Sequence, residues 1–271
     1  MTQGVVNALW FSPTGTTRKI VGEIAKEVAR RTNAKLREID ITPPQERTKE
    51  LVFAKDEVVV FGVPVYAGRV PNIILDYLYS IKGNKAKVIA VVLYGNRHFD
   101  DALIELTEIL KEDGFQVVGA GSFVGEHSFS KTLAAGRPNK EDIVLAKKLA
   151  EVVTKHLKSK EVVDVNIPGD GSALKYYQPQ RQTGEKIDIR KVKPQVSEAC
   201  NECGQCVLLC PMGSIVKGNV REYRGICIKC GACTKGCPQQ ARYIDDEGYL
   251  YHKEELEKRY MKDKDSAIYI D

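Results

Sequence analysis

Short runs of strand length, most of them apolar, alternate with amphipathic stretches over the first 160 residues of the chain. Five runs have the length of a β-strand and lie at residues 4–11, 35–41, 57–65, 87–93 and 116–123. Four stretches carry apolar residues at helical spacing and lie at residues 18–32, 71–82, 100–113 and 140–158. Strands that alternate with helices predict a parallel sheet, and strands that are apolar throughout predict a sheet covered on both faces.

The pattern changes after residue 160. Residues 161–195 show no clear period and contain a basic stretch at 186–193, so we expect a linker that partly wraps the first domain. A cysteine-rich segment follows at 196–245. Residues 246–271 are rich in charge, and we expect a C-terminal extension with a short helix at 254–260 and a solvated face. The sequence therefore predicts a first domain at 1–160 and a second at 196–245.

All eight cysteines of the chain lie between positions 200 and 237. They form two copies of the pattern C-x2-C-x2-C-x3-C-P, offset by 27 residues. The first copy is Cys200, Cys203, Cys206 and Cys210, and the second is Cys227, Cys230, Cys233 and Cys237. Gaps of two residues let the backbone curl around a cube of iron and sulfur, and eight thiolates are the number that two four-iron clusters need.

Residues 196–245 resemble the two-cluster ferredoxins of bacteria. In that family the fourth cysteine of each run binds the cluster of the other run. The resemblance implies two [4Fe-4S] clusters, the first held by Cys200, Cys203, Cys206 and Cys237 and the second by Cys210, Cys227, Cys230 and Cys233. It also implies a small α+β two-cluster ferredoxin domain. The alternative is structural zinc, but zinc ribbons use two C-x2-C pairs separated by a longer gap, without the third cysteine and the proline.

A hydroxyl-rich loop lies between the first predicted strand and the first predicted helix. It contains Ser12, Thr14, Gly15, Thr16 and Thr17. Backbone N–H groups and the positive end of a helix dipole face an anion at such a place, and the hydroxyls add neutral donors. The loop lacks the lysine of a Walker motif and has no G-x-G-x-x-G pattern, so a phosphate monoester such as that of FMN suits it better than a nucleoside triphosphate. The alternative is an ordinary capped helix.

This loop resembles the phosphate loop of flavodoxins, although Thr16 stands where flavodoxins often have Asn and Pro13 is a second departure. The resemblance implies an α/β flavodoxin-like fold, a doubly wound five-stranded parallel sheet of order 2-1-3-4-5. In that fold the ligand binds at the carboxyl ends of the strands. The loops after the third and fourth strands are then cofactor-binding candidates: Pro64, Val65, Tyr66, Ala67 and Gly68, and Tyr94, Gly95, Asn96 and Arg97.

Each of these loops offers groups suited to a flavin. Tyr66 and Tyr94 could stack on the two faces of the ring, and Asn96 could bond its edge. The alternative is surface aromatics that pack on their own loops. His127 follows the fifth strand and is a candidate for the flavin site or the contact between domains, although a lone histidine is more often structural.

Composition and charge argue against a nucleic-acid-binding protein and against a membrane-spanning one. The formal charge is +5, but two clusters with their thiolates carry about −4 and a flavin phosphate up to about −2, so the loaded protein lies near −1. No basic block with interleaved aromatics supports nucleic acid binding. The first residues lack a basic signal region, and no apolar run reaches the length of a membrane span. Clusters of free thiols need a reducing compartment, so we expect the cytoplasm of an anaerobe.

The whole chain resembles the fused flavodoxin–ferredoxin proteins, or iron–sulfur flavoproteins, of anaerobic bacteria and archaea. The resemblance implies electron transfer between two [4Fe-4S] clusters and FMN, in a low-potential carrier whose partners are other redox proteins. A flavin-dependent reductase of NAD(P)H or a small oxidant is the alternative, and a sensory or structural role is a third. A homodimer is compatible with the sequence. We also expect the higher potential at the cluster of Cys200, Cys203 and Cys206, since Asn201 is polar where the second copy has Ile228.

Overall fold

The computed structural model describes residues 4–159, 165–169 and 175–270. Five parallel strands form the central sheet of the first domain: β1 (Val5–Trp10), β2 (Lys35–Asp40), β3 (Val58–Pro64), β4 (Lys87–Tyr94) and β5 (Gln116–Val124). Their order across the sheet is β2-β1-β3-β4-β5. The predicted doubly wound order, 2-1-3-4-5, is therefore confirmed.

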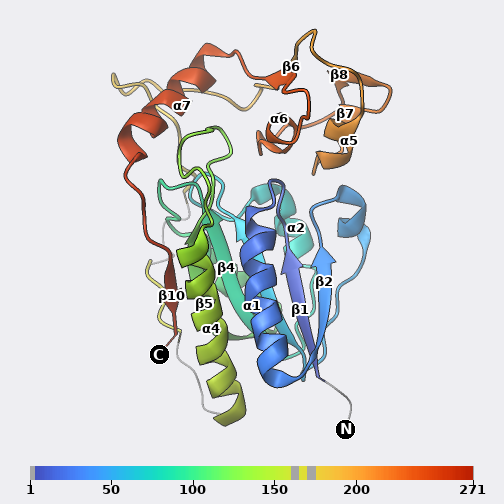
Figure 1. Cartoon of the computed structure of the whole chain (residues 1–271), viewed down its shortest axis with the longest axis vertical. Helices are drawn as coiled ribbons and strands as arrows, with labels where there is room; N and C mark the ends of the chain where they lie inside the picture. Colours follow the sequence, from blue (N-terminus) through green and yellow to red (C-terminus); the bar gives the residue numbers. More distant parts are fainter. Residues whose placement is uncertain (1–3, 160–164, 170–174, 271) are drawn as a thin grey trace.

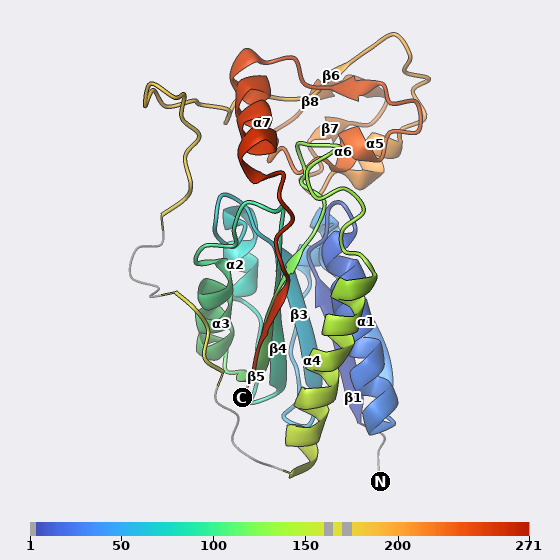
Figure 2. The same cartoon turned by 60° about the vertical axis from the view of Figure 1, so that its left-hand side comes forward.

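Helices cover both faces of this sheet (Figure 2). On one face lie α1 (Thr16–Thr32) and α4 (Lys140–Ser159), and on the other α3 (Ala102–Glu112) with the short α2 (Leu75–Leu78). Neighbouring strand residues alternate between the two cores, so that Val60 packs toward α1 while Phe61 packs toward α3. Trp10 is 2% exposed and belongs to the core on the α1 side. Among the described helices none is both long and apolar enough to cross a membrane.

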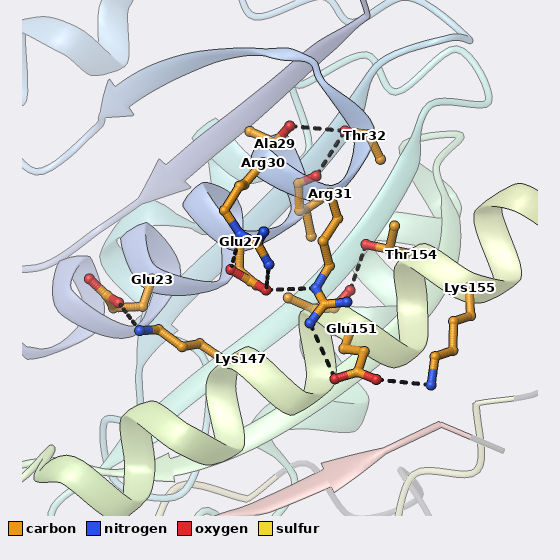
Figure 3. Close-up of polar contacts among 12 residues, drawn as sticks. Glu23, Glu27, Ala29, Arg30, Arg31, Thr32, Lys147, Glu151, Thr154 and Lys155 are labelled. Atoms are coloured by element: carbon orange, nitrogen blue, oxygen red, sulfur yellow. Dashed lines mark hydrogen bonds and ion pairs between the residues drawn. The ribbon is translucent and has the colours of Figure 1, made fainter.

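Charged side chains line the outer seam between α1 and α4 (Figure 3). Arg31 bridges the helices, since its guanidinium lies 2.6 Å from a Glu27 oxygen and 3.2 Å from a Glu151 oxygen. Lys147 pairs with Glu23 at 3.6 Å. Exposed ion pairs of this kind contribute at most about 1 kcal/mol each. The two helices are therefore held mainly by the apolar core beneath the seam.

The helix predicted at 71–82 is shorter in the structure. A 3-10 turn, η2 (Asn72–Ile74), leads into α2, which ends at Leu78. The chain then becomes extended, because the amide of Lys82 donates to the Leu51 carbonyl and its carbonyl accepts from Phe53, both at 2.9 Å. These pairings with a distant segment stop the helix, and helical periodicity alone does not reveal them.

The cysteine-rich domain is a small α+β unit, as predicted. Strand β6 (Gln195–Val196) pairs with β9 (Arg242–Tyr243), and β7 (Ile215–Val216) pairs with β8 (Asn219–Tyr223), both antiparallel. Two short helices, α5 (Gln205–Leu209) and α6 (Ala232–Lys235), lie between the strands. Figure 1 shows that this domain sits over the carboxyl ends of the parallel strands. That is the edge at which doubly wound sheets bind ligands.

The C-terminal segment returns to the first domain (Figures 1 and 2). Helix α7 (Glu247–Tyr260) is longer than the predicted 254–260, and its His252 and Leu256 are buried. Beyond it, β10 (Ala267–Tyr269) pairs antiparallel with β5 and adds a sixth strand, which the sequence did not predict. A strand of three residues is too short to give a recognisable alternation.

Two histidines lie where α7 meets the first domain. His252 stacks on Tyr177, and Phe129 lies 6.2 Å from its ring. Burial, helped by the nearby Arg97, lowers the pKa of His252 to about 4. Burial also lowers the pKa of His127 to about 3. Both imidazoles are therefore neutral in the folded protein at pH 7.

Acid is expected to weaken this junction. Below pH 6.5 the unfolded chain takes up a proton at His252 that the folded chain does not, so the unfolding free energy falls as pH falls. Replacing His252 by Phe should reduce the loss between pH 7.5 and 5.5 by about 1 kcal/mol. Urea unfolding at both pH values measures it, with the half-exposed His98 changed to Gln as control. Equal losses in the wild type and in His252→Phe would contradict the expectation.

Candidate functional site

Two cavities inside the cysteine-rich domain are each lined by four thiols. Cys200, Cys203, Cys206 and Cys237 line the first, which we call the outer thiol cavity because Cys203 is exposed. Cys210, Cys227, Cys230 and Cys233 line the second, the inner thiol cavity. Each set takes three cysteines from one motif and one from the other, which is the division predicted from the sequence. All eight are free thiols.

The local backbone explains how each motif surrounds a cavity. Gly204 and Gly231 precede α5 and α6 with φ of 73° and 80°, a left-handed conformation that turns the chain into a short helix. Amides on both motifs point at sulfur: Glu202 N lies 3.4 Å from Cys200 Sγ, and Ala241 N lies 3.3 Å from Cys237 Sγ. Ser214 N makes the equivalent contact with Cys210 Sγ at 3.4 Å. Such amide donors to sulfur are among the features that set cluster potentials.

The donor set fits iron–sulfur clusters. Burial raises the pKa of the Cys230 and Cys233 thiols to about 12 each, so they need a positive centre in the cavity to ionise. Within the described residues no three His, Cys, Asp or Glu side chains form a group placed to hold a metal ion. The thiols instead surround cavities, and four thiolates around a cavity are what a four-iron cluster requires.

A third cavity, the sheet-edge cavity, lies at the carboxyl ends of the strands, where doubly wound sheets bind their ligands. Eight of the predicted cofactor residues line it: Thr14, Thr16, Thr17, Pro64, Val65, Tyr66, Tyr94 and Gly95. The structure thus brings together the loops after the first, third and fourth strands.

The loop before α1 is arranged for an anion. The helix begins at Gly15, and no side chain caps it, so the hydroxyls are not used as an ordinary N-cap. Ser12 Oγ instead accepts from the amide of Arg18 at 3.0 Å. The buried Thr17 hydroxyl has no hydrogen-bond partner within the described protein. A buried donor left without a partner costs about 1–3 kcal/mol, and a phosphate oxygen in the cavity would satisfy it.

Six predicted cofactor residues lie outside the sheet-edge cavity. Ser12 and Gly15 line the outer side of the loop, toward α5 and Lys235. The Asn96 amide donates to the carbonyls of Tyr260 and Lys262, at 2.6 and 3.0 Å, so both of its hydrogens hold the C-terminal segment rather than a ligand.

The other three residues are used in contacts between loops. The Ala67 carbonyl accepts from Tyr177 N at 2.7 Å. Gly68 packs against the Asp100 side chain. Arg97 pairs with Asp100 and lies 4.4 Å over the Tyr177 ring. The linker supplies Tyr177, whose position could not be derived from the local sequence of these loops.

The sheet-edge cavity is completed by seven residues that were not among the predicted cofactor-binding residues. They are Pro13, Leu93, Gly125, Glu126, His127, Ser128 and Cys230. His127 Nδ1 accepts from Phe129 N at 3.1 Å, which places the proton of the neutral ring on Nε2 and makes that nitrogen a donor. The position of 125–128 after the fifth strand was a signal for this loop. The presence of Cys230 depends on how the domains dock.

The two domains are in close contact at this point. A Cβ on Gly231 would lie 2.6 Å from the Ser128 carbonyl oxygen, so the two backbones approach closely. Lys235 pairs with Glu126 at 3.2 Å. On the other side Arg47, in the 3-10 turn η1 (Pro44–Thr48), donates to the Pro211 carbonyl at 2.5 Å. Cys230 thereby lines both the inner thiol cavity and the sheet-edge cavity.

Comparison with known families identifies one segment of the chain. Residues 199–242 match the family model described as a 4Fe-4S dicluster domain. The match contains all eight cysteines and the strands from β7 to the first residue of β9. A search of curated proteins found no relative of the whole chain.

Solved structures resemble part of the chain. A flavodoxin from the domain Archaea is 16% identical and covers 58% of this chain and 99% of its own, with a TM-score of 0.41. Flavodoxin 1 from Bacillus cereus is 20% identical, with 57% and 99% covered and a TM-score of 0.41. An NADH:FMN oxidoreductase in its apo form is 14% identical, with 57% and 89% covered and a TM-score of 0.40. The flavodoxin-like fold of the first domain rests on its own strand order.

Proposed function

We propose that this chain, which joins a flavodoxin-like domain to a 4Fe-4S dicluster domain, is an electron carrier between iron–sulfur sites and FMN. The observation that carries the proposal is the position of Cys230, which lines both the inner thiol cavity and the sheet-edge cavity. Because one cysteine borders both cavities, no other helix or strand has to separate a cluster in the inner thiol cavity from a flavin in the sheet-edge cavity. The four-iron cluster exchanges one electron at a time, and a flavin takes one or two.

Each cavity has a defined role in this proposal. The inner and outer thiol cavities hold one four-iron cluster each, with the ligand sets described above. The sheet-edge cavity holds FMN, with its phosphate at Thr14, Thr16 and Thr17 and its ring near Tyr66 and Tyr94. His127 offers a neutral donor there, and Glu126 is engaged by Lys235. Cys203 is exposed at the outer thiol cavity, so that cavity is the side that a partner redox protein can approach.

The contact between domains favours a carrier over a reductase. Gly231 lies against Ser128, and Cys230 borders the sheet-edge cavity. The second domain therefore occupies space beside the cavity that a nicotinamide ring would need. The side chains of Tyr94 and Asn96 are likewise engaged by the C-terminal segment. The second domain and the C-terminal segment therefore restrict the approach to the cavity, which suits exchange of electrons with proteins rather than hydride with a nucleotide.

Anaerobic reduction tests the proposal. The purified protein should contain about eight irons and one FMN per chain, by metal analysis and chromatography of the released flavin. Reduced ferredoxin or dithionite should bleach both cofactors, and NADH or NADPH alone should bleach them at least about a hundredfold more slowly. Rapid bleaching by a nucleotide would establish the reductase instead. A protein with clusters that fails to retain added FMN would remove the assignment of the sheet-edge cavity.

Thr17 supplies a sharper test of the phosphate position. Replacing Thr17 by Val keeps the shape and removes the unpartnered hydroxyl, so the flavin-free protein should gain about 1 kcal/mol of unfolding free energy. The same change should weaken FMN binding about tenfold, because a phosphate contact is lost. Fluorescence titration with FMN and urea unfolding measure the two effects. In the control Thr107→Val, a buried hydroxyl that donates to Ile104 at 2.8 Å is removed, and FMN binding should not change.

Both effects of Thr17→Val must appear together. If the variant gained stability but bound FMN as tightly as the wild type, the Thr17 hydroxyl would not contact the phosphate.

A further inference from the structure

One arginine is buried inside the cysteine-rich domain. Arg242, on β9, is 5% exposed. Its Nη1 donates to the Tyr223 hydroxyl at 2.7 Å, and its Nη2 donates to the Val220 carbonyl. Within the described residues no carboxylate pairs with it. A buried charge is costly unless an opposite charge compensates it, so the counter-charge of Arg242 must come from another group.

The thiols of the outer thiol cavity are the available counter-charge. Arg242 lines that cavity together with Cys200, Cys203, Cys206 and Cys237. Cys206 and Arg242 therefore lie on the wall of one cavity. An arginine side chain stays protonated throughout the physiological pH range, so Arg242 keeps its charge there. The positive charge therefore lies at the edge of the outer thiol cavity.

The inner thiol cavity has no such charge at the equivalent place. The two cysteine motifs are offset by 27 residues, and the counterpart of Arg242 is Ile215. Ile215 is 3% exposed and lines the inner cavity. The correspondence extends to the preceding residues, since the amides of Ala241 and Ser214 contact Cys237 and Cys210 in the same way. The two halves of the domain thus differ by a buried cation at this matched position. They also differ at a second one, where the partly buried Lys229 lines the inner cavity and its counterpart, the exposed Glu202, lines the outer one.

Tyr223 stands between Arg242 and the inner thiol cavity. Its ring lines that cavity, and its hydroxyl donates to the Pro194 carbonyl at 2.8 Å while accepting from Arg242. The guanidinium carbon lies 5.6 Å from the centre of this ring. A phenol thus lies between the guanidinium and the inner cavity, whereas Cys206 and Arg242 line the same cavity.

We propose that Arg242 raises the reduction potential of the cluster in the outer thiol cavity. Reduction adds one negative charge to a cluster, and a buried cation beside its thiolates stabilises that charge. The proposal rests on the proposed function in one respect, since it requires that both cavities hold clusters. Arg242 acts on the cluster through its charge and contacts no substrate, so it is not a catalytic residue.

Asn201 was the sequence-based reason to expect the higher potential at this cluster. In the structure Asn201 Oδ1 accepts from Cys203 N at 3.3 Å in an exposed turn. The expected order of the two potentials stays a prediction, in which Arg242 favours the outer cluster and Lys229 favours the inner one.

Redox titration of the full-length, cluster-loaded protein tests the proposal. The two midpoint potentials are followed by electron paramagnetic resonance, and the signal of the outer cluster is assigned by its loss in Cys203→Ala. In Arg242→Gln the equilibrium constant for reducing the outer cluster should fall at least about tenfold, which is about 59 mV for one electron. The inner cluster should shift less. Arg242→Lys keeps the charge and should retain most of the wild-type potential.

The matched control removes an exposed positive charge from the same domain instead of a buried one. Arg224 lies in the same domain, its side chain is 78% exposed, and Arg224→Gln should leave both potentials nearly unchanged. Equal shifts in Arg242→Gln and Arg224→Gln, or a larger shift at the inner cluster, would overturn the proposal.

If Arg242→Gln loses the outer cluster altogether, its potential cannot be measured, and Arg242→Lys becomes the test. If the lysine variant keeps that cluster, the charge is required; if it loses it as well, Arg242 is structural and the proposal fails. A wild-type protein without iron would instead remove the proposed function itself.

Discussion

Replacing Cys230 by Ala is expected to abolish electron exchange between the iron–sulfur sites and the flavin. Cys230 is the one cysteine that lines both the inner thiol cavity and the sheet-edge cavity among the described residues. Its loss should remove the inner cluster, so that iron falls from about eight to about four per chain. The outer cluster and the FMN then have no shared boundary. Flavin reduced by light should remain reduced for minutes in this variant, whereas it should equilibrate with the clusters in the wild type.

Cys203→Ala is the matched variant. It removes a ligand from the outer thiol cavity, which does not border the sheet-edge cavity. Iron should again fall to about four per chain, yet exchange between flavin and the remaining cluster should stay close to the wild-type rate. Transient absorption of the flavin and cluster bands distinguishes the two variants. If both lost exchange equally, or if Cys203→Ala alone lost it, the order of the sites would be wrong.

Gly231→Ala is expected to separate the domains, and Gly204→Ala is expected not to. Both glycines occupy the same place in their motifs and have φ near +80°, so either substitution costs about 1–2 kcal/mol of backbone strain. Only at Gly231 does the new Cβ meet another domain, at 2.6 Å from the Ser128 carbonyl oxygen. At Gly204 no atom lies within 4 Å of the Cβ position in the described structure. Relief of the clash should add roughly 1–3 kcal/mol to the cost at Gly231.

The two glycine variants are compared by stability and by flavin–cluster exchange. Urea unfolding should give the larger loss of free energy for Gly231→Ala. Exchange between flavin and clusters should slow at least about tenfold in Gly231→Ala, since a wider junction moves Cys230 from the sheet-edge cavity. Gly204→Ala should unfold earlier than wild type but exchange electrons normally. Equal behaviour of the two variants in both measurements would mean that the contact with Ser128 is not a tight one.

Much of the fold could be predicted because its signals are local. Four of the five parallel strands are short apolar runs, and the helices between them have clear helical spacing. The order of the strands followed from the resemblance of the Ser12–Thr17 loop to flavodoxins. The helix over 71–82 was predicted too long, because its end depends on hydrogen bonds to Leu51 and Phe53, which lie about thirty residues earlier.

The candidate site was predicted as far as it depends on strand ends and on the cysteine spacing. Thr17, Tyr66 and Tyr94 line one cavity because parallel strands end at one edge of the sheet. The role of Asn96 was not predictable, because its partners Tyr260 and Lys262 lie more than 160 residues away. Cys230 reaches the sheet-edge cavity because the two domains dock there, and Arg242 reaches the outer thiol cavity through packing inside the second domain. Neither leaves a periodic or spacing signal in the sequence.

The return of the chain from α7 to β10 changes how the second domain is attached. This domain leaves the first domain through the linker, in which Tyr177 binds the Ala67 carbonyl, and comes back as β10 beside β5. It is therefore an insertion anchored to the first domain at two places, the loop after β3 and the edge of β5, rather than a module on a single tether. A double tether holds the partner surfaces at a high effective concentration without any large contact area. The iron–sulfur domain should thus stay docked through repeated turnovers, and exchange with outside proteins need not begin with its release.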